Sequence, residues 1–179
     1  MPITRSWKRA MALAAVAALA TVLPTAVTSA DPRSSALVQC QGTETVTYHP
    51  GVTFQPRPIA MATDGRFGSC AEAGGKGGVT SGSYGERFTV VASCNTLNEG
   101  FRARRTFTWN TGEASVAEVS GSSHTVAGQV VTVVTGTIEK GRYRGHRVVE
   151  LIPLPQPGAL QCLGTGFTGA TGVTTLTIV

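Results

Sequence analysis

Three histidines are the side chains of this sequence best suited to act as a general base near neutral pH: His49, His124 and His146. His49 precedes a proline at a predicted turn, His124 follows two serines near a predicted loop, and His146 lies in a basic hairpin. We expect each of them to be an exposed side chain without a catalytic role. A nucleophilic serine needs the pattern Gly-x-Ser-x-Gly on a strand-to-helix turn, and the segment around Ser122 does not provide it.

The carboxylates form no recognisable catalytic pair. A glycosidase needs two of them at a fixed separation in a cleft, whereas the ten acidic residues here are scattered singly. The nearest two, Glu113 and Glu118, are predicted on opposite faces of one strand, and we interpret all ten as solvated surface charges. The sequence also lacks a calcium loop, a phosphate-binding glycine loop and a cluster of metal ligands. We therefore predict no enzyme activity, no cofactor and no metal.

Arginine is the one functional side chain that is concentrated in the sequence. Arg102, Arg104 and Arg105 fall in one predicted strand, and a second basic cluster surrounds Tyr143 in a predicted hairpin. If the two elements are neighbours, their side chains form a basic patch that could hold an acidic polymer. The alternative is that long basic side chains protect exposed strand edges from aggregation. The candidate ligand-binding residues are Arg102, Arg104, Arg105, Arg142, Tyr143 and Arg144.

Four cysteines are present: Cys40, Cys70, Cys94 and Cys162. An even number in an exported chain indicates two disulfides. A zinc site is disfavoured because no two of the cysteines lie within a few residues of each other. Four cysteines allow three pairings, and sequence alone does not choose among them. We favour Cys40 with Cys70 and Cys94 with Cys162.

The elements that must position these residues are strands. After residue 31 no window keeps the apolar spacing of a helix, while short alternating runs rich in Thr and Val recur between Gly and Pro residues. We predict an all-β domain, an antiparallel β-sandwich of the Ig-like or Greek-key kind, with a small β-barrel as the alternative. About eight to ten strands are expected, among them residues 44–48, 57–63, 87–94, 101–109, 114–119, 129–138, 145–152 and 174–179.

Three connecting segments are also predicted. His49-Pro50-Gly51 has the composition of a turn between the first two strands. Residues 71–85 are glycine-rich and are expected to be a mobile surface segment. Residues 154–158 contain two prolines and are expected to lie outside the strand ladder.

Residues 1–30 resemble a secretory signal peptide. A short basic stretch precedes the apolar residues 10–23, and small residues at 28–30 predict cleavage before Asp31. As a helix, those fourteen apolar residues would extend about 21 Å, less than the ~30 Å hydrocarbon core of a bilayer. We therefore predict a single secreted domain of residues 31–179, extracellular or loosely cell-wall-associated, with no membrane span after removal of the signal.

The charge of the predicted mature domain is small. The whole chain has a formal net charge of +5, but three of its fifteen basic residues lie in residues 1–30. Twelve basic and ten acidic residues remain in the mature domain, which gives it a net charge of +2. Nucleic-acid binding needs a concentrated basic footprint, so we do not expect it. An anionic cell-wall polymer or an extracellular protein is the expected kind of partner.

Several strand and turn motifs carry a resemblance. These motifs are Cys40-Gln41-Gly42-Thr43, the run from Val46 to Thr53, Thr106-Phe107-Thr108-Trp109 and the closing residues 174–178. Through them the chain resembles small secreted four-cysteine all-β proteins of actinomycetes. That resemblance implies secretion and an all-β fold, and it carries over no catalytic residue. The expected function is a non-enzymatic extracellular binding or structural module. A secreted hydrolase (protease) inhibitor is the first alternative, and an uncharacterised secreted enzyme is the second.

Overall fold

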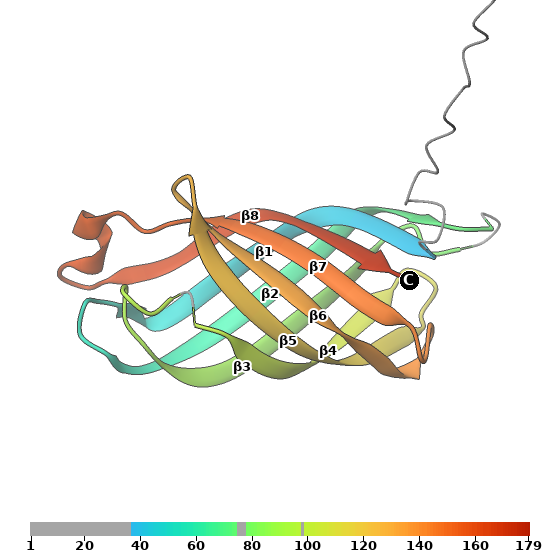
Figure 1. Ribbon diagram of the computed structural model, residues 1–179, viewed down its shortest axis with the longest axis horizontal. Helices are drawn as coiled ribbons and strands as arrows, with labels where there is room; N and C mark the ends of the chain where they lie inside the picture. Colours follow the sequence, from blue (N-terminus) through green and yellow to red (C-terminus); the bar gives the residue numbers. More distant parts are fainter. Residues whose placement is uncertain (1–36, 75–77, 98) are drawn as a thin grey trace, which may run out of the picture. The chain divides into compact units, whose positions relative to one another are not determined.

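The computed structural model describes residues 37–74, 78–97 and 99–179, and the predicted signal peptide lies outside these ranges. The described chain forms eight antiparallel strands, each paired with the next, and the last pairs with the first to close a barrel (Figure 1). None of its described helical segments is long and apolar enough to cross a membrane. The elements are β1 Val38–Val52, β2 Arg57–Glu72, β3 Gly82–Ala92, β4 Phe101–Trp109, β5 Ala114–Val126, β6 Gln129–Gly141, β7 Arg147–Pro155, the 3₁₀ turn η2 Ala159–Cys162, and β8 Phe167–Ile178.

The all-β prediction is confirmed, and the architecture is the barrel that the sequence offers as the alternative to a sandwich. The pairing of β1 with β8 decides between the two. It runs from Val38 opposite Ile178 to Thr47 opposite Gly169, so the sheet closes on itself instead of splitting into two layers.

The strand over residues 101–109 is predicted with its observed bounds, whereas most of the other strands are longer than predicted. The predicted turn at His49-Pro50-Gly51 is wrong, because these residues lie inside β1. The register between β1 and β8 shifts between Thr47 and Val52, and such an irregularity accommodates a proline within a strand. Gly51 is required there, because a Cβ at this position would lie 2.5 Å from the carbonyl oxygen of Thr165.

The two segments expected to lie outside the sheet belong to it in part. Residues 71–72 end β2 and residues 82–85 begin β3, so only the middle of the glycine-rich segment connects strands. In the proline-containing segment, Leu154 and Pro155 pair with Val130 and Gln129 of β6. Within the described residues, β7 pairs with β8 only up to Leu151, so its last residues are paired on one side, and a proline is tolerated on such an edge.

Both predicted disulfides are confirmed. Cys40 on β1 and Cys70 on β2 stand opposite each other in the ladder, and their sulfurs are bonded. Cys94 follows β3 and is bonded to Cys162 at the end of η2. Two disulfides are consistent with folding in an oxidising compartment.

The two ends of the barrel differ. At the end we call the open end, on the left in Figure 1, lie the connections 53–56, 127–128 and 156–166 and the described residues 93–97 and 99–100 of the β3–β4 connection. At the opposite end, the closed end, lie the connections 110–113 and 142–146, the described residues 73–74 and 78–81 of the β2–β3 connection, and the two ends of the described chain.

Aromatic side chains fill the closed half of the barrel interior. Phe107 and Trp109 stack with ring centroids 5.8 Å apart, and Phe67 lies 6.3 Å from Phe107. All three are buried, and the indole nitrogen of Trp109 donates a hydrogen bond of 2.9 Å to Ser115 Oγ. Alternate residues of the surrounding strands point inward and add aliphatic side chains, so this half is a closely packed core.

The backbone ladder of the described barrel wall is shortest between β3 and β4, where two residue pairs compare with four between β7 and β8. Within the described residues, β3 and β4 pair only through Gly82 opposite Trp109 and Ser83 opposite Thr108. Towards the open end the facing edges of these two strands, residues 84–92 and 101–107, carry no ladder, and we call this gap the seam.

Candidate functional site: a cavity above a buried charged layer

The open half of the barrel encloses a cavity of about 340 Å³. This volume lies at the lower end of the range of small-molecule sites, about 300–1,000 Å³. Its wall is mainly apolar and comes from most of the strands together with the connection between β3 and β4. The apolar lining includes Val46, Tyr48, Met61, Phe88, Val90, Leu97, Phe101, Val130, Ile152, Leu154, Phe167 and Ala170.

A layer of charged side chains separates this cavity from the aromatic core. Its centre is Arg105, which is 1 % exposed and projects inward from β4 because it shares the parity of Phe107 and Trp109. Arg105 Nε and Nη2 donate to the two carboxylate oxygens of Glu86 at 2.8 and 3.1 Å. Its Nη1 donates to Glu150 Oε2 from the opposite side. We call Glu44, Tyr84, Glu86, Arg105, Glu150 and Thr174 the charged layer.

The salt bridge between Arg105 and Glu86 crosses the seam. Counting on from the last backbone pairs, Glu86 of β3 stands opposite Arg105 of β4. A bidentate contact between side chains therefore joins the two strands where the backbone ladder has ended. Burial alone lowers the pKa of Arg105, but its hydrogen bonds with Glu86 and its attraction to Glu150 outweigh this effect and raise it. Arg105 remains a cation.

Glu150 is fully buried and has a second partner. Its Oε1 accepts a hydrogen bond of 2.8 Å from Thr174 Oγ1 of the neighbouring strand β8. Both carboxylate oxygens of Glu150 are therefore hydrogen-bonded, one by Arg105 and one by Thr174. This satisfies a charge that would otherwise be costly to bury.

Glu44 is held differently. Its Oε2 accepts a hydrogen bond from the hydroxyl of Tyr84, which reaches over the intervening strand β2. Gly65 of β2 makes this possible, because it stands between Glu44 and Tyr84 in the register and a Cβ there would lie 2.1 Å from the Tyr84 ring. Burial raises the pKa of Glu44 to about 7, against the opposing effects of the Tyr84 hydrogen bond and of Arg105.

Two hydroxyl groups complete the polar part of the lining. Ser123 and Thr132, on β5 and β6, hydrogen-bond each other through their hydroxyls at 2.9 Å. Thr63 of β2 is 7 % exposed, and its Oγ1 is buried without a hydrogen-bond partner in the described part of the chain. Buried hydroxyls are normally hydrogen-bonded, so Thr63 is an unused polar group in the cavity wall.

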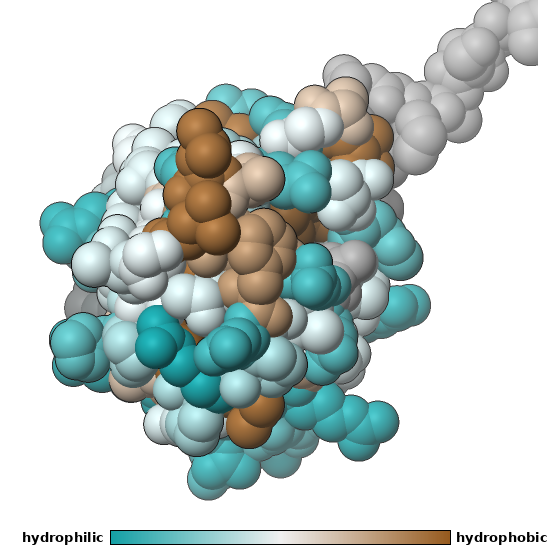
Figure 2. Space-filling view, turned by 90° about the vertical axis from the view of Figure 1, so that its left-hand side faces the viewer, coloured by the Kyte–Doolittle hydropathy of each residue, from teal (hydrophilic) through white to brown (hydrophobic). Residues whose placement is uncertain are grey.

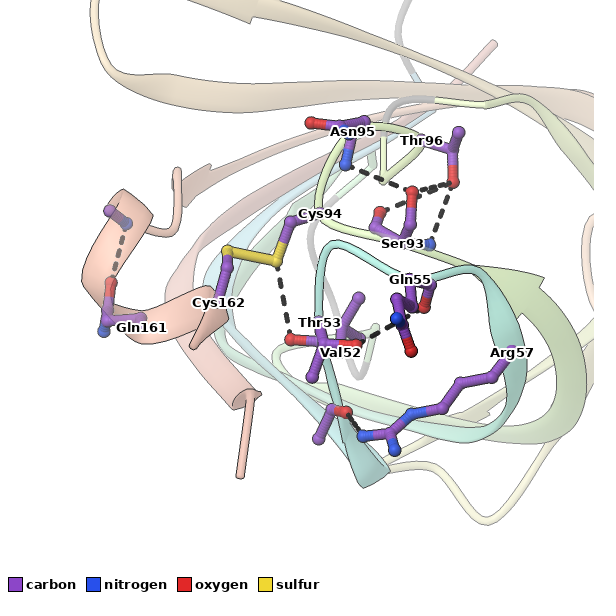
Figure 3. Close-up of a disulfide and its surroundings, with 12 residues drawn as sticks. Val52, Thr53, Gln55, Arg57, Ser93, Cys94, Asn95, Thr96, Gln161 and Cys162 are labelled. Atoms are coloured by element: carbon purple, nitrogen blue, oxygen red, sulfur yellow. Dashed lines mark hydrogen bonds between the residues drawn. A yellow bond between two sulfur atoms is a disulfide. The ribbon is translucent and has the colours of Figure 1, made fainter. Parts of the chain in front are cut away.

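The rim of the cavity is held by the second disulfide (Figure 3). The bond between Cys94 and Cys162 ties the β3–β4 connection to η2, and Cys94 Sγ lies 3.4 Å from the carbonyl oxygen of Val52. Next to it, Ser93 N donates to Thr96 Oγ1 at 3.0 Å. The loop that contributes Thr96 and Leu97 to the cavity wall is thus held by the disulfide of Cys94 and by the hydrogen bond between Ser93 and Thr96.

The end face around this rim is partly apolar. Figure 2 looks onto the open end and shows several groups of hydrophobic side chains among polar ones. The exposed apolar residues in the elements of this end are Phe54, Val91, Val126, Leu160 and Leu163.

The structure separates the arginines of the predicted basic patch. The prediction that Arg105 belongs to a surface patch is wrong, because this residue lies inside the barrel and not on the surface. Arg102 and Arg104 project outward from the same strand, and Arg104 Nε donates to Glu118 at 2.6 Å. On the outer face, carboxylates therefore lie among these cations.

The other half of the predicted patch lies at the closed end. Arg142 forms salt bridges with Glu72 and Glu113, and the Tyr143 hydroxyl also donates to Glu72. Burial and the hydrogen bond with Glu72 raise the pKa of Tyr143 to about 12. Arg144 is exposed. Binding of an anionic polymer by the outward-facing arginines stays a prediction.

The interpretation of all acidic residues as surface charges is wrong for Glu44 and Glu150, which are buried, and for the nearly buried Glu86 side chain. The sequence holds a signal for each of them. Glu150 stands between the inward-facing Val148 and Ile152, and Glu44 shares the parity of Val46. His49, His124 and His146 are exposed, and none of them lines the cavity.

The described residues contain no group of three side chains placed to hold a metal ion. No protein-family model matches the chain, and neither a characterised protein nor a solved structure shows significant similarity to it.

Proposed function

We propose that this protein is a secreted, non-enzymatic binding protein that takes one small, largely apolar molecule into the open half of its barrel. The cavity of about 340 Å³ with its mainly apolar wall is the observation that carries the proposal. Pockets of this kind, apolar with a few polar groups at one end, are the usual form of small-molecule sites.

The contrast with the closed half supports a ligand. Protein interiors are normally packed without large voids, and the closed half follows this rule. An apolar cavity loses the dispersion contacts that a filled core would provide. A molecule that fills it supplies those contacts and removes its own apolar surface from water, at about 25 cal/mol per Å².

Secretion is part of the proposal. The signal-like residues 1–30 and the pairing of all four cysteines both fit a protein that acts outside the cytoplasm. The disulfide at the rim would preserve the shape of the cavity entrance there.

The test fills the cavity with a side chain. Ala170 lines the cavity, so Ala170→Phe introduces a phenyl ring into it, whereas Ala60→Phe places the same ring on the exposed face of β2. The neutral fluorescent probe N-phenyl-1-naphthylamine is titrated into each protein. We expect saturable one-to-one binding to the wild type, a loss of at least about tenfold in affinity for Ala170→Phe, and little change for Ala60→Phe. Equal affinities of the two variants would contradict the proposal.

One observation favours a second candidate function, an enzyme. Glu44 lines the cavity with a pKa of about 7, which suits a general acid or base at neutral pH. Recovery of bound molecules from the wild type decides between the two functions. A carrier returns them unchanged, whereas an enzyme returns a product that Glu44→Gln does not form.

A further inference from the structure

Charge within the barrel is unbalanced. Glu44, Glu86 and Glu150 reach the charged layer from three strands, and Arg105 is the one cation that they share in the described structure. All three guanidinium nitrogens of Arg105 donate to Glu86 and Glu150. Among the residues that the structure describes, Glu44 is thus the carboxyl group of the layer without a salt bridge.

Glu44 also faces the cavity with unused hydrogen-bonding capacity. Within the described residues its one hydrogen bond comes from Tyr84 to Oε2, and Oε1 accepts none. Thr63, on the neighbouring strand, offers a buried hydroxyl with no partner in the described chain. Thr63 stands opposite Val46 and Glu44 opposite Gly65, so the two side chains are diagonal neighbours on the inner face, about 7 Å apart at Cβ. One small polar group between them could contact both.

We propose, on the basis of the function above, that the ligand is a lipophilic amine whose ammonium group pairs with Glu44 at the floor of the cavity. The ammonium donates to Glu44 Oε1 and to Thr63 Oγ1, and the apolar body lies against the wall above them. Tyr48, Phe88, Phe101 and Phe167 line that wall, and aromatic faces tolerate a cation passing them.

The chemistry of the site favours an ammonium over other head groups. A carboxylate would stand beside three carboxyl groups and be repelled. A neutral hydroxyl could donate a hydrogen bond to the ionised Glu44 but would not compensate its charge. An ammonium supplies the missing cation, and charge-assisted hydrogen bonds are stronger than neutral ones.

Binding of an amine then depends on pH through the ionisation of Glu44. Within the described residues, the charged or titratable groups that face Glu44 are Tyr48 on its own strand, Tyr84 and Glu86 on β3, Arg105 on β4 and Glu150 on β7. Strands β2 and β8, which flank β1, contribute the uncharged Thr63 and Thr174. With a pKa of about 7, Glu44 is mostly protonated at pH 6 and mostly ionised at pH 8, so amine affinity should rise about tenfold between them.

The experiment compares three ligands with one alkyl chain: decylamine, decanol and decanoate. Each displaces N-phenyl-1-naphthylamine from the wild type, from Glu44→Gln and from Asp64→Asn. Asp64→Asn is the matched control, because this substitution removes the same charge from the outer face of β2, one residue from Gly65. Thermal unfolding verifies that each variant is folded, and Thr63→Val provides a second change at the site.

At pH 8 we expect decylamine to bind at least about tenfold more tightly than decanol, and decanoate to bind most weakly. Glu44→Gln should remove the preference for the amine and leave decanol within about threefold, Thr63→Val should weaken the amine by a smaller factor, and Asp64→Asn should behave as the wild type. If decanol binds as tightly as decylamine, or if Glu44→Gln leaves the amine unchanged, the amine proposal is overturned while the binding function stands. If neither the probe nor any of the three ligands binds, both proposals are overturned.

Discussion

The two halves of the barrel interior are built from the same eight strands, yet one is filled and the other is hollow. In the closed half the aromatic side chains of Phe67, Phe107 and Trp109 lie in contact and are almost completely buried. In the open half most of the inward residues are also apolar, but Phe88 and Phe101 remain partly exposed around a cavity. The closed half supplies the packing that stabilises the fold, and this allows the open half to remain hollow.

The charged layer lies at the boundary between the two halves. Its salt bridges are costly to desolvate, and their contribution to the free energy of unfolding is smaller than that of a packed core. Glu44 is held above the aromatic residues by its hydrogen bond from Tyr84. Tyr84 is held there by Arg105, whose guanidinium lies 4.3 Å from the centre of its ring.

The largest expected effect is a difference in unfolding free energy between a variant of the filled half and a variant of the hollow half. Phe107→Ala removes a fully buried ring from the core and should lower the free energy of unfolding by about 3–5 kcal/mol. Phe88→Ala removes the same atoms from the cavity wall and should cost only about 1 kcal/mol, because the ring is already partly solvated. Urea denaturation measures both. Equal losses would mean that the two halves do not differ in packing.

The next effect concerns the boundary. Arg105→Met leaves Glu86 and Glu150 buried without their cation and should destabilise the fold by about 3 kcal/mol. The control adds Glu86→Gln and Glu150→Gln to the same chain, which removes the unpaired charges and should restore much of the loss. The comparison uses urea denaturation at neutral pH. A single Arg105→Met variant as stable as the wild type would show that the layer is not held by these pairs.

The smallest effect concerns Glu44, whose contribution to the free energy of unfolding changes with pH. Its folded pKa is raised from 4.5 to about 7, so the folded state prefers the protonated carboxyl and the protein loses stability as pH rises through this interval. Glu44→Gln keeps an acceptor for Tyr84 without the charge. It should therefore stabilise the ligand-free protein by roughly 2–3 kcal/mol at pH 8, with most of the difference gone at pH 5. Unfolding curves at the two pH values measure this, and a difference independent of pH would contradict it.

The sequence predicts those features that depend on local pattern. Alternation defines the strand from Phe101 to Trp109, and the even cysteine count with its two favoured pairings is confirmed. The first half of β8 is missed because Gly169 and Gly172 interrupt its alternation, and only its pairing with β1 makes it a strand. The same pairing, which closes the barrel, involves residues more than a hundred positions apart, so no local signal reports it.

The cavity depends on the same kind of long-range information. Arg105, Glu44 and Glu150 each stand at an inward position of their own strand, but the sequence does not show that the three strands bring them into one layer. Taken singly, a charged residue in an alternating strand is more often solvated than buried. The closure of the barrel turns three isolated charges into one site.

The seam gives the open half one further property. A strand paired on one side only has alternate amide groups that find no carbonyl partner in the sheet. Along residues 84–92 of β3 and 101–107 of β4, the amides that point into the seam are in this position, whereas β1 is hydrogen-bonded by both of its neighbours. Hydrogen exchange at those amides should be fast compared with β1. We expect β3 and β4 to separate locally along the seam, and the salt bridge between Glu86 and Arg105 to oppose this opening.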